Sequence, residues 1–364
     1  MEMIAEGHDF GVYVHIPFCA SRCDYCAFVT NVGKLDRADA YVAAVVREIE
    51  GARSSGRWRI PSTVFVGGGT PSLLPKGALA QVLAAIDAPV GAEVTVEANP
   101  ESATRWFLEE ARGSGVTRIS LGAQSFVEHV RVGLGRQGDA AAIPRAVREI
   151  GALGFPSFNV DLIYGAPAER DEDFEETLDA LLALEPTPPH VSGYALTVEA
   201  GTPLSRDPSR HPDDDVLARR YEAIDDRLEA AGYRWYEISN WAKPGHECQH
   251  NVSCWHGGEY LGFGCAAHGH FDGERFANVA SFERYITRVN DGYSPVAWRE
   301  RLGETERVVE RLELALRTRD GVPNDALFDD PALDGLVART ARHAVLTRRG
   351  RLLANEVTLR LRPS

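Results

Sequence analysis

The sequence predicts an α/β fold, in which an open, partial (β/α)6 barrel is followed by an α-rich C-terminal domain that contains small strands. Three observations support this prediction. Short β-branched segments alternate with segments of helical period, glycines and prolines follow the expected strands, and the pattern changes after Pro203. A more closed βα barrel is the alternative.

The alternation can be followed through about six βα units. We expect strands at residues 11–16, 62–69, 93–100, 117–125, 158–165 and 190–197. We expect helices at Leu35–Gly51, Lys76–Ile86, Arg105–Arg112, Ala140–Leu153 and Asp173–Leu184. In βα folds the active site lies at the carboxyl ends of the strands, where this sequence has segments such as VGGGTPS and IYGAPAE.

The change of pattern predicts two domains, residues 1–205 and residues 206–364. The stretch SRDPSRHPDDD is polar and contains prolines, as expected of a linker or an exposed loop, and a helix is expected after it at Val216–Ala231. The tail from Glu304 has two apolar runs separated by a basic turn, which suggests a small winged-helix-like unit. We interpret that unit as a structural lid.

Composition excludes several classes of protein. The 364 residues are 44% hydrophobic and 25% charged, as in an ordinary folded domain, and the net charge is −14. That charge disfavours a nucleic-acid partner or an anionic membrane surface. The N-terminus is acidic, and no apolar window reaches the length of a membrane span. We therefore expect a cytoplasmic protein with no integral membrane segment.

Three of the six cysteines lie within eight positions, and their clustering predicts a metal centre. Cys19, Cys23 and Cys26 directly follow the apolar run VYVHIPF, so their thiols occupy the loop that leaves the first strand. Thiolates are the ligands of iron–sulfur clusters. A four-iron cube has four corners, so three cysteines leave one iron open to another ligand.

A zinc site is the alternative for this loop. Structural zinc sites are four-coordinate and closed, so a fourth ligand from elsewhere in the chain would be required. The candidates are His15, Cys248, Cys254 and Cys265. Zinc loops usually contain paired C-x2-C elements, which this triplet lacks.

The spacing C-x3-C-x2-C, with Tyr25 before the last cysteine, resembles the radical SAM superfamily. The GGGTP segment at residues 67–71 is similar to the family's glycine-rich motif. The resemblance implies a [4Fe–4S] cluster whose open iron binds S-adenosylmethionine (SAM) through its amino and carboxylate groups. An electron donor would reduce the cluster, and SAM cleavage would give a 5′-deoxyadenosyl radical.

The same resemblance implies further SAM contacts on successive βα units. Gly69 and Thr70 would bind the amino group, Arg136 would pair with the carboxylate, and Asp161 would lie near the cationic sulfur. A carboxylate such as that of Glu97 accepts ribose hydroxyls. The remaining implied contacts are Tyr13, Tyr25, Gln124 and Ala195.

Within the superfamily the chain resembles the coproporphyrinogen-oxidase-like branch, which includes the oxygen-independent oxidase and the HemW-type heme chaperones. The oxidase has a fourth cysteine two positions after the third, where this chain has Phe28. It also has a longer segment before the cluster, whereas 18 residues precede Cys19. The segment His250–Trp255 resembles the heme-associated H-N-x-x-Y-W motif, with Cys254 in place of tyrosine.

These features imply a chaperone that binds heme and delivers it to heme-acceptor proteins. Imidazole and thiolate are both competent ligands of heme iron, which makes His250 the first candidate and Cys254 the second. The alternative is an oxygen-independent coproporphyrinogen III dehydrogenase, which would use the same cluster and SAM for a radical oxidative decarboxylation.

Overall fold

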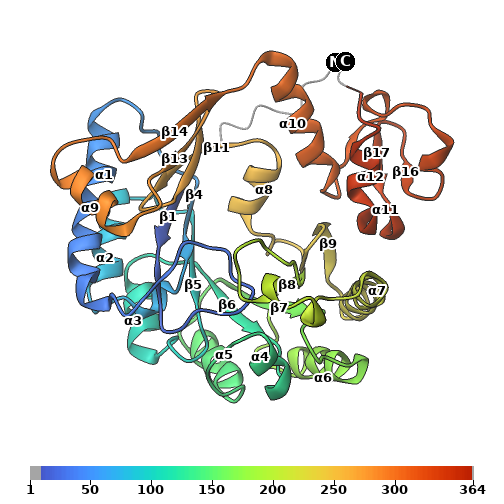
Figure 1. Ribbon diagram of the computed structural model, residues 1–364, viewed down its shortest axis with the longest axis horizontal. Coiled ribbons are helices and arrows are strands. Elements are labelled where there is room, and N and C mark those ends of the chain that lie inside the picture. Colours follow the sequence, from blue (N-terminus) through green and yellow to red (C-terminus); the bar gives the residue numbers. More distant parts are fainter. Residues whose placement is uncertain (1–9, 363–364) are drawn as a thin grey trace.

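The computed structural model describes residues 10–362, and its central feature is a sheet of twelve strands (Figure 1). Six of these strands run parallel in the order in which they occur along the chain. They are β1 (Phe10–Ile16), β4 (Thr63–Gly68), β5 (Glu93–Ala98), β6 (Arg118–Gln124), β7 (Ser157–Tyr164) and β8 (His190–Ala195). The predicted α/β class and parallel sheet are confirmed.

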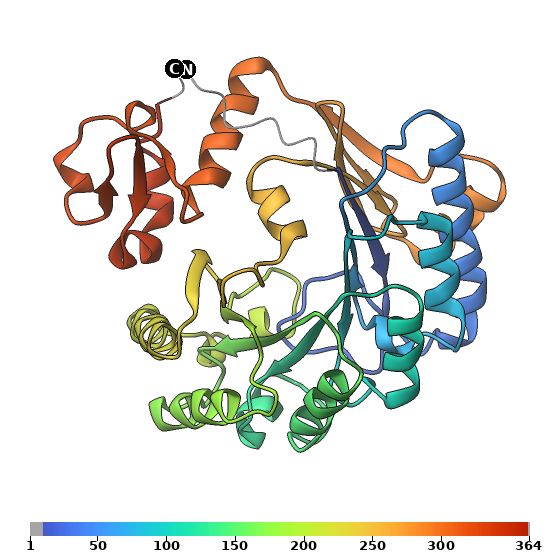
Figure 2. The same ribbon diagram turned by 180° about the vertical axis from the view of Figure 1, so that it is seen from behind.

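Helices follow the parallel strands and form an arc around the outside of the sheet (Figures 1 and 2). They are α1 (Ala38–Ser54), α2 (Ala78–Ile86), α3 (Arg105–Gly113), α4 (Glu128–Gly133), α5 (Ala142–Ala152), α6 (Asp171–Leu182) and α7 (Asp214–Ala230). Asp213 caps α7, because its Oδ1 accepts from the backbone N–H of Val216 at 3.0 Å. The outer layer therefore matches the expected βα repetition.

The sheet is wider than the sequence predicts, because strands from the C-terminal half extend both of its ends. Beyond β1 the sheet continues with β11 (Glu259–Phe263), β12 (His268–Phe271), β13 (Glu274–Asn278) and β14 (Val296–Arg301). Beyond β8 it continues with β10 (Asn240–Ala242) and β9 (Arg234–Glu237). Strand β11 pairs with β1 in parallel. The boundary after residue 205 remains a prediction, and strands from both sides of it share this sheet.

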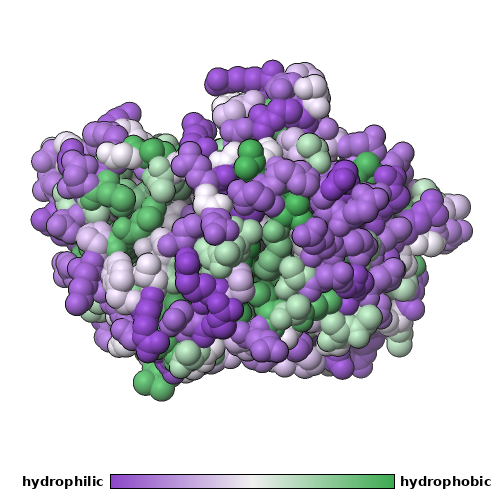
Figure 3. All heavy atoms as spheres, turned by 90° about the horizontal axis from the view of Figure 1, so that it is seen from below, coloured by the Kyte–Doolittle hydropathy of each residue, from purple (hydrophilic) through white to green (hydrophobic). Residues whose placement is uncertain are grey.

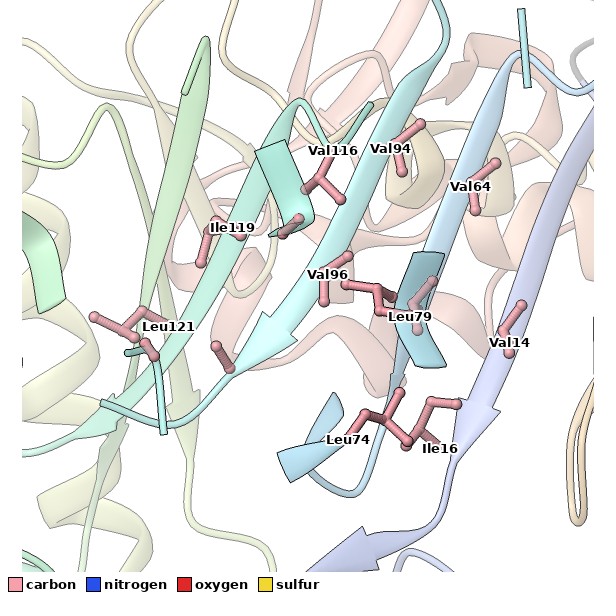
Figure 4. Close-up of a cluster of buried hydrophobic side chains, with 14 of the residues drawn as sticks. Val14, Ile16, Val64, Leu74, Leu79, Val94, Val96, Val116, Ile119 and Leu121 are labelled. Carbon is pink, nitrogen blue, oxygen red and sulfur yellow. The ribbon is translucent and has the colours of Figure 1, made fainter. Parts of the chain in front are cut away.

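The apolar core lies between the sheet and the outer helices. Figure 4 shows Val14 and Ile16 of β1, Val64 of β4 and Val96 of β5 packed near Leu79 of α2. Each of these side chains is buried. The alternate residues of the same strands face the barrel interior, and many of them are polar, so the interior differs chemically from the packed outer layer.

The chain continues with helix α8 (Gln249–Trp255) and, between β13 and β14, helix α9 (Phe282–Asn290). Figures 1 and 2 place α8 in the opening between the two ends of the sheet, where it contacts β4 and α10. The last region comprises α10 (Glu304–Leu316), β15 (Val322–Pro323), β16 (Val337–Arg339), β17 (His343–Leu346), α11 (Arg348–Leu352) and α12 (Ala354–Thr358). It has its own three-stranded sheet and its own apolar cluster.

Among residues 10–362, no helix has the length and apolar character needed to cross a bilayer. The face shown in Figure 3 is mostly hydrophilic, with hydrophobic residues in smaller groups between the polar ones. Apolar atoms normally make up a large share of the surface of folded proteins.

Asp225 of α7 joins the last region to the barrel. Its side chain is 6% exposed and accepts from the indole N–H of Trp241 at 2.7 Å. Arg351 of α11 donates to both oxygens of the same carboxylate, at 3.0 and 2.6 Å, and Arg348 donates to one of them at 2.5 Å. This carboxylate therefore neutralises a buried guanidinium across two parts of the fold.

We expect Asp225→Ala to lower the free energy of unfolding by about 3–5 kcal/mol, because it leaves the buried Arg351 without its charge partner. The neighbouring Asp226→Ala is the matched control: its side chain is 64% exposed and pairs with Arg348 at the surface. Urea unfolding followed by circular dichroism measures both. Equal losses in the two variants would contradict this role of Asp225.

Candidate functional site

A cavity of about 610 Å³ lies at the carboxyl ends of the parallel strands. The cysteine loop after β1 and residues within or just after the next five parallel strands contribute to its wall. Of the predicted site residues, the cavity is lined by Cys19, Cys23, Tyr25, Cys26, Gly69, Thr70, Glu97, Gln124, Arg136, Asp161 and Ala195. The fold thus brings residues spread over about half the chain to one place.

The cysteine loop is held at both of its ends. Strands β2 (Phe18–Cys19) and β3 (Asn31–Val32) pair in parallel and close the loop. His15 Nε2 lies 2.8 Å from the carbonyl oxygen of Val29, and the backbone N–H of Asp24 donates to the carbonyl of Leu134 at 3.1 Å. These contacts fix the loop against β1 and against the segment after α4.

Two of the thiols have hydrogen-bond donors beside them. Thr70 Oγ1 lies 3.8 Å from Cys19 Sγ, and Arg136 Nη1 lies 4.0 Å from Cys23 Sγ. Hydrogen bonds to sulfur and nearby positive charge favour a thiolate and tune the potential of an iron–sulfur cluster. Burial raises the pKa of the Cys19 and Cys26 thiols in the protein without metal.

Among the described residues, no group of three or more His, Cys, Asp or Glu side chains is placed to hold a single metal ion. Three of the four candidates for a fourth zinc ligand have other contacts. His15 bonds Val29, Cys265 is fully buried beside Tyr41, and Cys248 lies beside Glu93. The ligand set of the cysteine loop remains a prediction.

The glycine segment at the end of β4, residues 67–69, requires residues without a side chain. A Cβ on Gly69 would lie 2.6 Å from the carbonyl oxygen of Phe18, and a Cβ on Gly67 would lie 2.7 Å from the Glu97 carboxylate. Gly68 has a φ of 109°, which L-residues rarely adopt, and its N–H donates to Glu97 Oε2 at 2.9 Å. The backbone here can approach the cysteine loop closely.

Two carboxylates face the cavity from adjacent layers of the barrel interior. Burial raises the pKa of Glu97 to about 7, although the N–H of Gly68 partly opposes this shift. Burial also raises the pKa of Asp161, which accepts from Asn159 Nδ2 at 2.6 Å and from Ser120 Oγ at 3.1 Å. Such carboxylates suit a cationic ligand, because its charge favours their ionised form.

Arg136 and Asn99 form a hydrogen-bonded pair on the cavity wall. Arg136 Nη2 donates to Asn99 Oδ1 at 3.1 Å and to the carbonyl of Gly122 at 2.7 Å, and Asn99 Nδ2 donates to Thr70 Oγ1 at 3.1 Å. Arg136 Nε is buried and has no hydrogen-bond partner among the described residues. An unpaired buried donor of this kind suits an anionic group of a ligand.

Sequence reasoning missed Asn99, although it lies in the VEANP segment that also contains Glu97. It missed Ser120 and Asn159, whose inward position follows from strand alternation. Gln124 was predicted, and it has a φ of 66°, unusual for a residue other than glycine. Backbone strain of this kind is common at binding sites.

Tyr13, also predicted as a SAM contact, is outside the lining of the cavity. Its hydroxyl lies 3.0 Å from His15 Nδ1, and its ring stacks on Phe65. It therefore occupies the layer of the interior beneath the cavity. Its role as a SAM contact remains a prediction.

His250 lies at the opposite end of the barrel, near the starts of the strands. Its ring Nδ1 is 2.9 Å from the hydroxyl of Thr63, the first residue of β4, and its backbone N–H donates to Glu93, the first residue of β5, at 3.1 Å. The ring packs beside Phe65 and Tyr260. Burial lowers the pKa of His250 to about 4, so its imidazole is neutral at physiological pH.

Cys254 is one helical turn after His250 on α8, so both side chains project from the same side of that helix. Cys254 is partly buried, and burial raises the pKa of its thiol to about 11. Neither residue lines the large cavity. The structure therefore does not bring the candidate heme ligands together with the residues predicted to bind the cluster and SAM.

The residues of the large cavity fit a [4Fe–4S] cluster and SAM. Three cysteines from one loop lie beside a glycine segment with close backbone approach, an unpaired Arg136 donor and two carboxylates. The cysteines suit iron, the Arg136 donor suits an amino acid carboxylate, and the two carboxylates suit a cationic nucleoside. No chemistry in the lining conflicts with that assignment.

Comparison with known proteins agrees with this geometry. The family model of the Radical SAM superfamily matches residues 13–181. The chain is similar to the heme chaperone HemW of Mycobacterium tuberculosis, with 42% identity over 96% of this chain and 94% of that protein. It is also similar to HemW of Bacillus subtilis, at 30% identity over 95% and 97% of the two chains, and to HemW of Escherichia coli, at 40% over 71% and 69%.

A solved structure supports the fold. Coproporphyrinogen III oxidase (HemN) from Escherichia coli, described as a Radical SAM enzyme, superimposes with a TM-score of 0.85 over 96% of this chain and 89% of that chain, at 23% identity. At that identity the likeness establishes the architecture alone. Because the HemW proteins match at higher identity along nearly the whole length, the chain belongs to the HemW family of the radical SAM superfamily.

Proposed function

We propose that this protein is a heme chaperone, which binds heme and transfers it to heme-acceptor proteins. The observation that carries the proposal is the similarity, over 96% of the chain, to a protein named heme chaperone HemW. The helix α8 supports it, because it carries an imidazole and a thiol on one side, and both groups bind heme iron in other proteins.

The large cavity would hold a [4Fe–4S] cluster and SAM. Cys19, Cys23 and Cys26 would bind three irons, and the cluster, when bound, supplies an open iron for SAM and an electron from an outside donor. Arg136 would orient the SAM carboxylate, and Glu97 would accept the ribose hydroxyls. The candidate heme ligands His250 and Cys254 lie outside the lining of this cavity, so heme would bind apart from the cluster and SAM.

Phe28 favours the chaperone over the oxidase. It stands where the oxidase pattern has a further cysteine, and its side chain is 67% exposed at the wall of the cavity. An exposed phenyl group adds apolar surface but no metal ligand there. Anaerobic incubation of the reconstituted protein with coproporphyrinogen III and SAM tests the alternative, because protoporphyrinogen formation would contradict the chaperone proposal.

We expect Cys19→Ala, Cys23→Ala and Cys26→Ala each to lose the cluster, because each removes one of its three thiolates. Iron and sulfide are measured after anaerobic reconstitution. Cys254→Ser, at the other end of the barrel, is the control and should keep wild-type iron and sulfide. Zinc without iron in the wild-type protein would show that the loop is a zinc site.

We expect SAM affinity to increase about tenfold between pH 6 and pH 8. Burial raises the pKa of Glu97 to about 7, so at pH 6 most of the carboxyl groups carry a proton that a cationic ligand must displace. Above pH 7 the group is already ionised, and this cost disappears. Equilibrium dialysis of labelled SAM against the reconstituted protein measures the affinity.

Glu97→Gln should bind SAM more weakly and with much less pH dependence. The matched control is Glu109→Gln, on the exposed face of the outer helix α3. If Glu97→Gln kept the full wild-type pH dependence, Glu97 would not be the titrating group.

We expect His250→Ala to weaken heme binding by about tenfold or more, equivalent to about 1.4 kcal/mol, and to shift the heme absorption spectrum. Cys254→Ser should change the spectrum only if the thiolate is the second ligand. Heme titration measures both, and transfer to a heme-free acceptor protein measures delivery. Unchanged affinity and spectrum in the double variant would place the heme site elsewhere.

A further inference from the structure

A second cavity, of about 170 Å³, lies on the other side of α8 from His250. It is bounded by α8 and by the loop that follows α10. Its lining is Tyr236, Glu247, Gln249, Val252, Trp255, His256, Thr318, Arg319 and Asp320. The cavity is small compared with the roughly 300–1,000 Å³ of pockets that enclose a drug-sized ligand, so it would take only the edge of a larger molecule.

The α8 segment presents two histidines in different environments. His250 is 6% exposed, and its Nδ1 is hydrogen-bonded to Thr63. His256, at the C-terminal end of the helix, has a side chain that is 34% exposed. Heme in solution can therefore reach the imidazole of His256 without any movement of the helix, whereas it cannot reach that of His250.

The partner of His256 is weakly held. His256 Nε2 lies 3.3 Å from Asp320 Oδ2, and the Asp320 side chain is 66% exposed. An exposed contact of this kind contributes little free energy, so an incoming metal ion can displace the carboxylate from the imidazole. The nitrogen that faces Asp320 is then available as a ligand.

The surroundings of His256 match the other parts of a metalloporphyrin. Trp255 supplies an indole in the wall of the cavity, and the Arg317 guanidinium lies 5.7 Å from its ring centroid. Arg319, whose side chain is 41% exposed, pairs with Glu247 at 3.1 Å. An aromatic face suits a flat conjugated ring, and an exposed guanidinium suits a carboxylate side chain.

We propose that this second cavity is the first contact site for heme, with His256 as the initial iron ligand. A movement of α8 would then give the iron access to His250. The inference rests on the proposed chaperone function and deepens it. The macrocycle edge would lie against Trp255, and one propionate would bind the exposed side of the Arg319 guanidinium beside Glu247. Because the second cavity is small, it would contact only part of the heme, as expected of a transient binding site.

Rapid mixing of hemin with the full-length, cluster-reconstituted protein tests this order of events. We expect His256→Ala to slow heme association by about tenfold while the final absorption spectrum stays that of the wild type. His129→Ala is the matched control: this exposed histidine lies on the outer helix α4, and its partner Asp173 keeps Arg170. It should associate at the wild-type rate.

Asp320→Ala gives a test in the opposite direction. Removing the carboxylate frees Nε2 of His256, so association should be faster than in the wild type, a result that misfolding cannot produce. Equal association rates in wild type, His256→Ala and Asp320→Ala, with heme still bound, would overturn the first contact site and leave the proposed function intact. Absence of heme binding by the wild type would overturn both.

Discussion

The parallel pairing of β1 on both of its sides is the constraint on which the rest of the structure depends. Strand β4 pairs with one side of β1 and β11 with the other, so β1 is an interior strand of the sheet. The cysteine loop leaves directly from its carboxyl end. The point at which that loop begins is therefore fixed by the hydrogen bonds of two neighbouring strands, and the loop's own contacts with Val29 and Leu134 hold the rest of it.

The strand residues that face the barrel interior are more polar than those that face the outer helices. The outward residues of the strands are apolar and pack under the helices, whereas the inward residues include Glu97, Ser120, Asn159 and Asp161. Polar groups in such an interior must find partners: Ser120, Asn159 and Asp161 hydrogen-bond to one another, and Glu97 accepts from the N–H of Gly68. The polar interior also leaves room for a ligand at the strand ends, which a fully packed apolar barrel core would not.

Much of this arrangement could be predicted from the sequence because its signals are local. The cysteine spacing, the glycines after β4 and the polar residues at strand ends lie within single βα units, and parallel strands bring those ends together. The pairing of β11 with β1 could not be predicted, since it joins residues about 250 positions apart without a local signal. The orientation of α8 could not be predicted from the sequence either, because seven residues make too short a pattern to define a buried face.

Glu93 has a consequence for the strength of heme binding. Its carboxylate accepts from the backbone N–H groups of Gln249 and His250, both at 3.1 Å, and so holds the start of α8 against the barrel. If the iron must displace this helix to reach His250, the measured affinity equals the intrinsic affinity multiplied by the small population of the open form. A carrier built in this way binds its cargo less tightly than its ligands allow, and each closing of the helix favours release.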